Sequence, residues 1–280
     1  MKITKINEYI GAEVTGVNLN KPISEAIKIE IYNALLDNVA LIIRDQNFSA
    51  EEFMQAVSLF GELMEDQNRR YLADGAPMVS VLSNRHLDSA GKPAKIANNA
   101  TWHTDHTNQE YPPKFTVLYP VALPDAGGGT ALCNMRAAYA ALSDEWKVKI
   151  DHMKTANTLI SSARSSTGNL DIVKEQEVAG IPPMIHPLVR THPERGTCSI
   201  WFHKAKTENI IGMEPQETQD FLAELLEEAI RPEFTYTHEY KLGDMLVIDN
   251  RSSMHKAGFD YDHSQHRMLY RALVRGDRPF

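Results

Sequence analysis

The sequence predicts a mainly β domain with flanking helices, arranged as a β-barrel or jelly roll. Three observations favour this fold class: many short apolar runs after residue 102, amphipathic helical stretches inserted between them, and no stretch with linker composition or repeat period. The 280 residues are therefore expected to form a single domain over 1–280. A chain of this length buries roughly 75% of its unfolded surface, so it needs no disulfide framework to fold.

The N-terminal part carries the clearest helix signals. Ser24 is a plausible N-cap for a helix over 25–38, where Ile27, Ile31 and Leu35 recur at helical spacing. An apolar strand is expected over 39–43. A capping box from Ser49 to Glu52 then begins a second helix.

The later part alternates short strands with two longer helices. Strands are expected over 115–119, 130–133, 188–190, 199–202, 234–237, 245–249 and 267–274. Helices are expected over 137–153 and 215–230, and residues 161–183, rich in Ser, Gly and Pro, are expected to form a long excursion that acts as a lid.

Charge and cysteine usage exclude several classes of protein. Lys and Arg number 29 against 37 Asp and Glu, a net charge of −8, which argues against a nucleic-acid or acidic-membrane binder. Cys133 and Cys198 form neither a disulfide framework nor a zinc pattern. No apolar run approaches the ~20 residues of a membrane span, and the N-terminus lacks a signal-peptide core. A cytoplasmic protein is expected.

The sharpest chemical feature is the tetrapeptide from Trp102 to Asp105, which contains His103. In a strand, residues two apart point to one face, so this pattern would present an imidazole beside a carboxylate. A second histidine would complete the two-histidine, one-carboxylate triad that leaves open positions on Fe(II). The alternative is a surface His and Asp on an edge strand.

The third ligand must come from elsewhere, and His255 is the preferred candidate. It follows the apolar run 245–249 and precedes Gly258. His186 and His192 each precede a proline and are expected in loops, whereas His263 and His266 lie in a polar stretch and are expected to be solvated.

Two arginines near the C-terminus give a second signal. In a strand over 267–274, Arg267 and Arg271 share one face. Inward arginines are costly unless an anion neutralises them, and bidentate carboxylate recognition suits arginine. Salt bridges to Asp or Glu are the alternative. Thr130 directly follows three glycines, a pattern that indicates a tight turn.

Together these segments resemble the taurine dioxygenase (TauD/TfdA) family of Fe(II)/2-oxoglutarate-dependent dioxygenases. The resemblance covers nearly the whole chain. It is carried by Ile10-Gly-Ala-Glu-Val-Thr-Gly-Val, Leu41-Ile-Ile-Arg-Asp-Gln, Trp102-His-Thr-Asp, Gly128-Gly-Thr, His186-Pro-Leu-Val-Arg-Thr-His-Pro, Asp249-Asn-Arg, and His255 followed by Arg267 and Arg271.

The resemblance implies a distorted jelly roll (double-stranded β-helix) and assigns the site. It implies that His103, Asp105 and His255 bind Fe(II), which 2-oxoglutarate chelates through its C1 carboxylate and ketone. The distal carboxylate of 2-oxoglutarate would contact Arg267 and Thr130. On the substrate side, Arg271 would lie near the substrate anion, and Asn99 would also face the substrate.

One stretch departs from the family pattern. After Gly61-Glu-Leu, taurine dioxygenases carry a His and a Tyr that help hold the substrate. This chain has Met64-Glu-Asp-Gln-Asn-Arg-Arg-Tyr instead. The resemblance therefore does not extend to the taurine contacts.

The expected activity is hydroxylation of a small organic acid, a carboxylate or sulfonate, with Fe(II) as cofactor and 2-oxoglutarate and O2 as co-substrates. Succinate and CO2 would be released. The enzyme is expected to be a homo-oligomer, with no nucleic-acid or membrane partner. Two alternatives stay open: a zinc-dependent hydrolase or isomerase on the same type of barrel, and a non-catalytic sensor of small acids. A dicarboxylate site at Arg267 and Thr130 disfavours the hydrolase, and the complete set of metal ligands disfavours the sensor.

Overall fold

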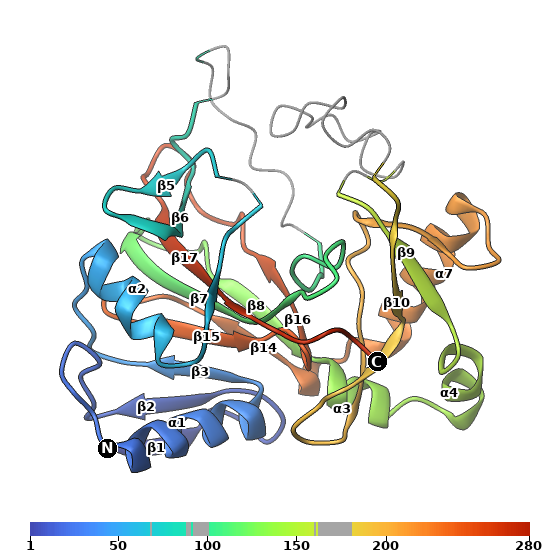
Figure 1. Cartoon of the computed structure of the whole chain (residues 1–280), viewed down its shortest axis with the longest axis horizontal. Helices are drawn as coiled ribbons and strands as arrows, with labels where there is room; N and C mark the ends of the chain where they lie inside the picture. The colour runs from blue at the N-terminus through green and yellow to red at the C-terminus, as the bar shows by residue number, and fades with distance from the viewer. Residues whose placement is uncertain (68, 88–90, 92–100, 160, 162–180) are drawn as a thin grey trace.

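The computed structural model describes residues 1–67, 69–87, 91, 101–159, 161 and 181–280 (Figure 1). Within these residues the protein is mainly β with few helices, as the sequence predicts. The α-helices are α1 (Glu25–Asn38), α2 (Ala50–Ser58), α3 (Met135–Ala140), α4 (Asp144–Ile150) and α7 (Pro215–Ala229), and a 3₁₀ turn covers Pro232–Phe234.

The largest sheet has nine strands, and its order differs strongly from the chain order. The order is β1-β2-β3-β15-β7-β17-β6-β5, and β4 pairs with β17. The strands are β1 (Lys2–Lys5), β2 (Ala12–Thr15), β3 (Ala40–Ile43), β4 (Leu63–Met64), β5 (Leu72–Ala73), β6 (Ala76–Ser83), β7 (Pro113–Ala122), β15 (Met245–Asp249) and β17 (Met268–Arg275). N-terminal strands thus lie beside strands from near the C-terminus.

Three smaller sheets complete the described strands. One has the order β14-β8-β16, from Thr235–His238, Thr130–Asn134 and Ser253–Ala257. The second has the order β10-β9-β13, from Met184–Pro187, Lys154–Asn157 and Thr207–Ile210. The third pairs β11 (Val189–Thr191) with β12 (Cys198–Ile200).

The large sheet is covered on both faces, because its central strands alternate apolar residues in two directions. Val247 of β15 belongs to a core cluster that contains Leu35 of α1 and Phe53 of α2. Its neighbour Leu246 belongs to a different cluster, together with Leu132 of β8. Helices α1 and α2 therefore cover one face, and the sheet that contains β8 packs against the other (Figure 1).

The expected helix caps are confirmed. The hydroxyl of Ser24 accepts a hydrogen bond from the amide of Ile27 at the start of α1. Ser49 and Glu52 form a complete capping box at the start of α2. The strand expected over 39–43 begins at Ala40, because Val39 caps α1 in the left-handed region with φ 68°.

The single helix expected over 137–153 is wrong. The chain forms α3 and α4 instead, and each helix has its own polar cap. The side chain of Asn134 accepts hydrogen bonds at the start of α3, and the hydroxyl of Ser143 accepts one from Trp146 at the start of α4. The apolar spacing over 137–153 by itself predicts one helix, but the second polar cap interrupts it and starts a new helix.

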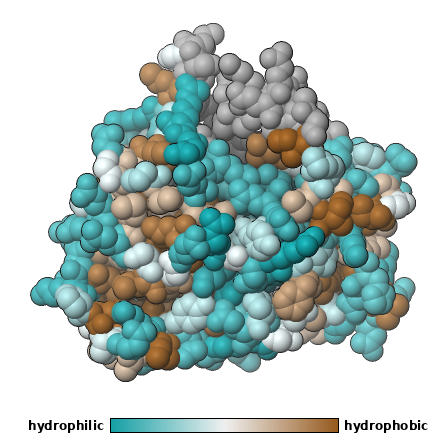
Figure 2. All heavy atoms as spheres, in the orientation of Figure 1, coloured by the Kyte–Doolittle hydropathy of each residue, from teal (hydrophilic) through white to brown (hydrophobic). Residues whose placement is uncertain are grey.

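The exposed surface carries no extended apolar face in the view of Figure 2, where hydrophobic residues form small, separate groups among hydrophilic ones. The described residues include no helix that combines the length and the hydropathy needed to cross a membrane.

Candidate metal centre

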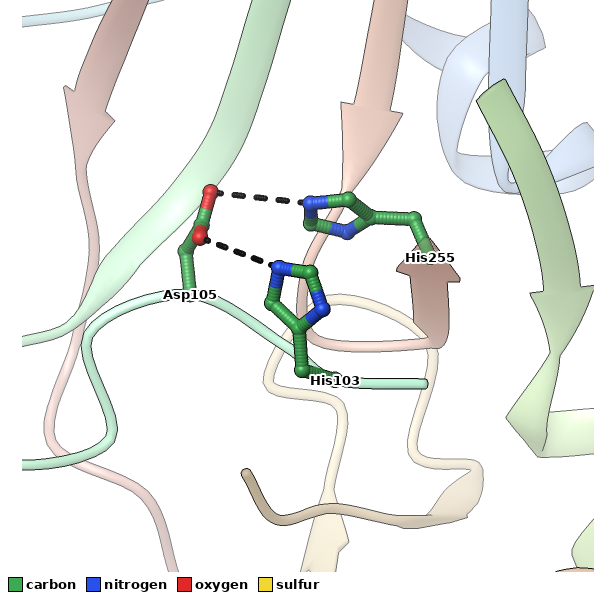
Figure 3. A group of neighbouring side chains, drawn as sticks. All are labelled: His103, Asp105 and His255. Carbon is green, nitrogen blue, oxygen red and sulfur yellow. Dashed lines mark ion pairs between the residues drawn. The ribbon is translucent and has the colours of Figure 1, made fainter. Parts of the chain in front are cut away.

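Three side chains predicted to bind a metal come together in the structure. One ligand atom from each of His103, Asp105 and His255 can be chosen so that all lie within 4.8 Å of one another, and all three residues are buried. Nε2 of His103 lies 3.8 Å from Oδ1 of Asp105, and Nε2 of His255 lies 3.9 Å from Oδ2 (Figure 3).

The local backbone differs from the expected strand. Among the described residues, His103 forms isolated β-bridges with His255 and with His203 instead of a strand, and Asp105 lies in a turn. The backbone amide of His103 donates to the carbonyl of His255 at 3.0 Å, and the reverse bond is 2.8 Å. This two-way pairing brings the two imidazoles together, whereas the turn aims the carboxylate of Asp105 at them. The spacing argument therefore named residues that the structure brings together, but it assumed the wrong local structure for them.

The tautomer of His103 is set by its backbone neighbour. Its Nδ1 lies 2.8 Å from the carbonyl oxygen of Thr101. A carbonyl only accepts hydrogen bonds, so Nδ1 carries the proton and Nε2 presents its lone pair toward Asp105. A backbone carbonyl is a common orienting partner of metal-bound histidine.

The ionisation states also suit metal ligands. Burial lowers the pKa of His103. Burial and the neighbouring His103 lower the pKa of His255 to about 3. Burial alone would raise the pKa of Asp105, but His255 and Arg271 hold it well below its usual value. Two neutral imidazoles beside an ionised carboxylate form the set that a divalent metal requires.

A second cluster holds the residues predicted to bind a dicarboxylate. Nε of Arg267 donates to the carbonyl of Gly128 at 2.7 Å, and Gly128 lies two residues before Thr130. The hydroxyl of Thr130 lies 2.8 Å from that of Tyr240. Burial raises the pKa of Tyr240 to about 12, and the charge of Arg267 opposes this rise. Arg267, Thr130 and Tyr240 therefore form one group of hydrogen-bonding side chains around one cation.

The glycine at position 128 is required by this arrangement. Its φ is 70°, and a Cβ atom there would lie 2.9 Å from Nε of Arg267. A side chain at this position would therefore displace the side chain of Arg267.

Residues 2–273 match the family described as taurine catabolism dioxygenase TauD, TfdA family. The chain belongs to this family. A TauD/TfdA relative, the alpha-ketoglutarate-dependent 2,4-dichlorophenoxyacetate dioxygenase of Burkholderia sp. (strain RASC), is 30% identical over 96% of this chain and 92% of its own length. The (S)-phenoxypropionate/alpha-ketoglutarate-dioxygenase of Sphingobium herbicidovorans is 29% identical over 98% of this chain and 95% of its own length.

Among solved structures, AAD-2 in complex with Mn(II) and N-oxalylglycine superposes with a TM-score of 0.83 and 30% identity, covering 99% of this chain and 98% of that one. The TauD/TfdA member described here is therefore an alpha-ketoglutarate-dependent dioxygenase.

Arg271, predicted to face the substrate anion of this TauD/TfdA enzyme, has an acidic partner within the chain. Its Nη2 forms an ion pair with Oδ2 of buried Asp66. Ser80 donates to the same carboxylate at 2.7 Å, and His106 lies 3.7 Å from its other oxygen. Burial would raise the pKa of Asp66, but Arg271 and His106 lower it to about 2.

Three other residues near the site were missed from the sequence. Buried Lys206 donates to Gln67 at 3.0 Å and to Asn108 at 2.9 Å. Burial of His106 and, next, the charge of Lys206 lower the pKa of His106 to about 4. Tyr240 could have been found from its two-residue spacing after Tyr236 and His238, which a longer strand would place on one face, although β14 ends at His238. Lys206 and Asp66 follow no such pattern.

The remaining expectations have mixed outcomes. Asn99 and most of the excursion 161–183 lie outside the described residues. The loop assignment of His186 is wrong, because it lies buried in β10. The loop assignment of His192 is confirmed, since it follows β11, but the residue is buried and its Nε2 lies 3.1 Å from Oδ2 of Asp249. Of the polar-stretch histidines, His263 is exposed and His266 is half-buried.

Proposed function

We propose that His103, Asp105 and His255 hold Fe(II) and that the enzyme hydroxylates a small organic acid bearing a carboxylate or sulfonate. The observation that carries the proposal is the buried triad, with its ligand atoms within 4.8 Å and its ionisation states suited to a divalent metal. Two histidines and one carboxylate typify iron centres that keep positions open for co-substrates. Bound iron would supply the oxidative chemistry that converts 2-oxoglutarate and O2 to succinate and CO2 while a substrate C–H bond is hydroxylated.

We place the distal carboxylate of 2-oxoglutarate at Arg267 and Thr130. Arg267 offers a charged donor, and the hydroxyls of Thr130 and Tyr240 lie 2.8 Å apart beside it. The similar structure of AAD-2 holds N-oxalylglycine, whose two terminal carboxylates have the same separation along the chain as those of 2-oxoglutarate, and this supports a dicarboxylate as co-substrate. A dicarboxylate site of this kind disfavours the zinc hydrolase, and the complete set of metal ligands disfavours the sensor.

The fold proposal is a distorted jelly roll in one domain over 1–280. Its support is the packing of the sheet β14-β8-β16 on the large sheet, where Leu132 and Leu246 share one core cluster. Cys133 and Cys198 are free, which supports a cytoplasmic location.

Arg271 is proposed as the partner of the substrate anion. Its charge contributes to the low pKa of Asp105, so the guanidinium lies close to the metal centre. Asp66 occupies Nη2, whereas buried Nε has no hydrogen-bond partner among the described residues. A substrate anion that accepts hydrogen bonds from the remaining N–H groups of Arg271 would satisfy this guanidinium.

Arg271→Gln removes the charge but keeps hydrogen-bonding groups. We expect the KM for the substrate to rise about tenfold or more, because hydrogen bonds to charged groups contribute about 1.5–3 kcal/mol. The KM for 2-oxoglutarate should change much less, and succinate formation should continue without substrate oxidation. Steady-state kinetics for both substrates test this. An equal rise in both KM values would instead assign Arg271 a purely structural role with Asp66.

The function itself is tested with a panel of sulfonates, aryloxy acids and amino-acid-derived acids. Succinate formation and substrate loss must be measured together, because succinate alone also arises from uncoupled turnover. At least one acid should show equal amounts of both, dependent on Fe(II). Hydrolysis of a panel member without consumption of 2-oxoglutarate would support the hydrolase instead.

A further inference from the structure

Thr116 contacts the carboxylate of Asp105, one of the three proposed metal ligands. This residue lies in β7 and is buried. Its hydroxyl donates to Oδ2 of Asp105 at 2.5 Å. A short hydrogen bond to an ionised carboxylate in a buried position is of the strong, charge-assisted kind.

The hydroxyl of Thr116 is itself held by a second residue. Nδ2 of Asn250 donates to Oγ1 of Thr116 at 2.8 Å. The hydroxyl has one proton, and ionised Asp105 can only accept. Thr116 must therefore donate to Asp105 and accept from Asn250, which fixes the direction of both bonds.

Asn250 is anchored through its backbone rather than its side chain. Its amide donates to the carbonyl of Lys114 at 2.9 Å. Its carbonyl accepts from the hydroxyl of Thr104 at 2.9 Å and from Nε1 of Trp201 at 3.0 Å. These bonds tie Asn250 to β7, to the residue next to Asp105 and to the residue after β12.

The residue before Asn250 is fixed as well. Asp249 accepts from Nε of Arg251 at 2.9 Å and lies 3.1 Å from Nε2 of His192. All three of these side chains are buried. The link between β15 and β16, the strand that carries His255, is therefore rigid, and so is the position from which Asn250 reaches Thr116.

We propose that Asn250 and Thr116 form a positioning relay that orients Asp105 and reserves its Oδ2 for a hydrogen bond, so that the carboxylate binds the metal through one oxygen. The proposal rests on the assignment of His103, Asp105 and His255 as metal ligands. Thr116 and Asn250 are positioning residues, because they act through Asp105. A hydrogen bond that engages one carboxylate oxygen disfavours chelation of the metal through both oxygens, which leaves coordination positions open for co-substrates.

The test is Co(II) binding to the full chain without oxygen, followed by visible absorption, which reports both affinity and coordination. Thr116→Val removes the hydroxyl but keeps the shape, and it should weaken Co(II) about 10- to 100-fold and alter the absorption spectrum. Thr116→Ser should restore both. Thr155→Val is the matched control, since Thr155 is a buried strand threonine of β9 and should bind Co(II) as the wild type does.

Asn250→Ala removes the amide donor but keeps the backbone bonds, and it should weaken Co(II) less than Thr116→Val. The double variant should bind like Thr116→Val alone, because both residues act through one hydroxyl. Wild-type Co(II) affinity and absorption spectrum in Thr116→Val would overturn the relay. It would also be overturned if Thr116→Ser lost as much Co(II) affinity as Thr116→Val, or if the losses of the two single variants added fully in the double variant.

Two further outcomes are decisive. If Thr116→Val does not fold, Thr116→Ser and Asn250→Ala decide, and wild-type affinity in Asn250→Ala overturns the relay. His103→Ala separates the relay from the metal site. If His103→Ala binds Co(II) with wild-type affinity, the ligand assignment fails. If His103→Ala loses Co(II) affinity but Thr116→Val keeps it, only the relay is refuted.

Discussion

Replacing His103, Asp105 or His255 by alanine is expected to abolish both metal binding and turnover while the chain stays folded. Each residue would supply one of three protein ligands, and their ligand atoms lie within 4.8 Å. Loss of a direct ligand should exceed the 10- to 100-fold cost of losing an outer partner. The measurements are Fe(II) or Co(II) affinity and succinate formation, with circular dichroism to confirm folding.

A matched control is His152→Ala, since His152 is exposed and lies outside the site. It should retain full activity. Metal removal should also be reversible: chelation should abolish the activity of the wild type, and added Fe(II) should restore it. Iron-dependent activity near the wild-type level in His255→Ala would show that another histidine completes the triad.

The second large effect is expected from Arg267→Ala. This change removes the cation placed at the distal carboxylate of 2-oxoglutarate, and truncating one member of a buried charge pair costs about 2–5 kcal/mol. The affinity for 2-oxoglutarate should fall by about 30-fold to several thousand-fold. Thr130→Val should cost only about 0.5–1.5 kcal/mol, the contribution of one hydrogen bond. Calorimetric titration of 2-oxoglutarate into the metal-loaded protein measures both.

Arg275→Ala provides the control for Arg267→Ala. Arg275 ends the same strand, β17, but its side chain is exposed and pairs with Glu62 at 3.0 Å. Surface pairs contribute little, so the affinity for 2-oxoglutarate should stay unchanged. If Arg267→Ala bound 2-oxoglutarate as tightly as Arg275→Ala does, the distal carboxylate would lie elsewhere.

Local signals in the sequence predicted much of the fold because they reflect local physics. The caps at Ser24 and Ser49 depend only on neighbouring residues, and both are confirmed. The apolar run 245–249 corresponds to β15 because the strand is buried on both faces. The prediction of one helix over 137–153 is wrong because it relied on apolar spacing and did not take into account the polar cap that divides the segment.

The sequence named side chains that the structure brings together, but it did not predict their geometry. His103 and Asp105 were predicted as neighbours on the assumption of a strand, whereas His103 lies in an isolated β-bridge and Asp105 in a turn. The ion pair between Arg271 and Asp66 joins residues 205 positions apart, and no sequence periodicity reports such a contact. The same holds for the relay from Asn250 to Thr116, which spans 134 positions.

The most direct test of the central claim is whether the purified protein converts 2-oxoglutarate to succinate and CO2 in the presence of Fe(II) and O2. The account predicts that succinate forms with the wild type, that chelation stops it, and that His255→Ala does not form it even with excess iron. Undiminished succinate formation by His255→Ala, or none by the iron-loaded wild type with any acid of the panel, would contradict the account.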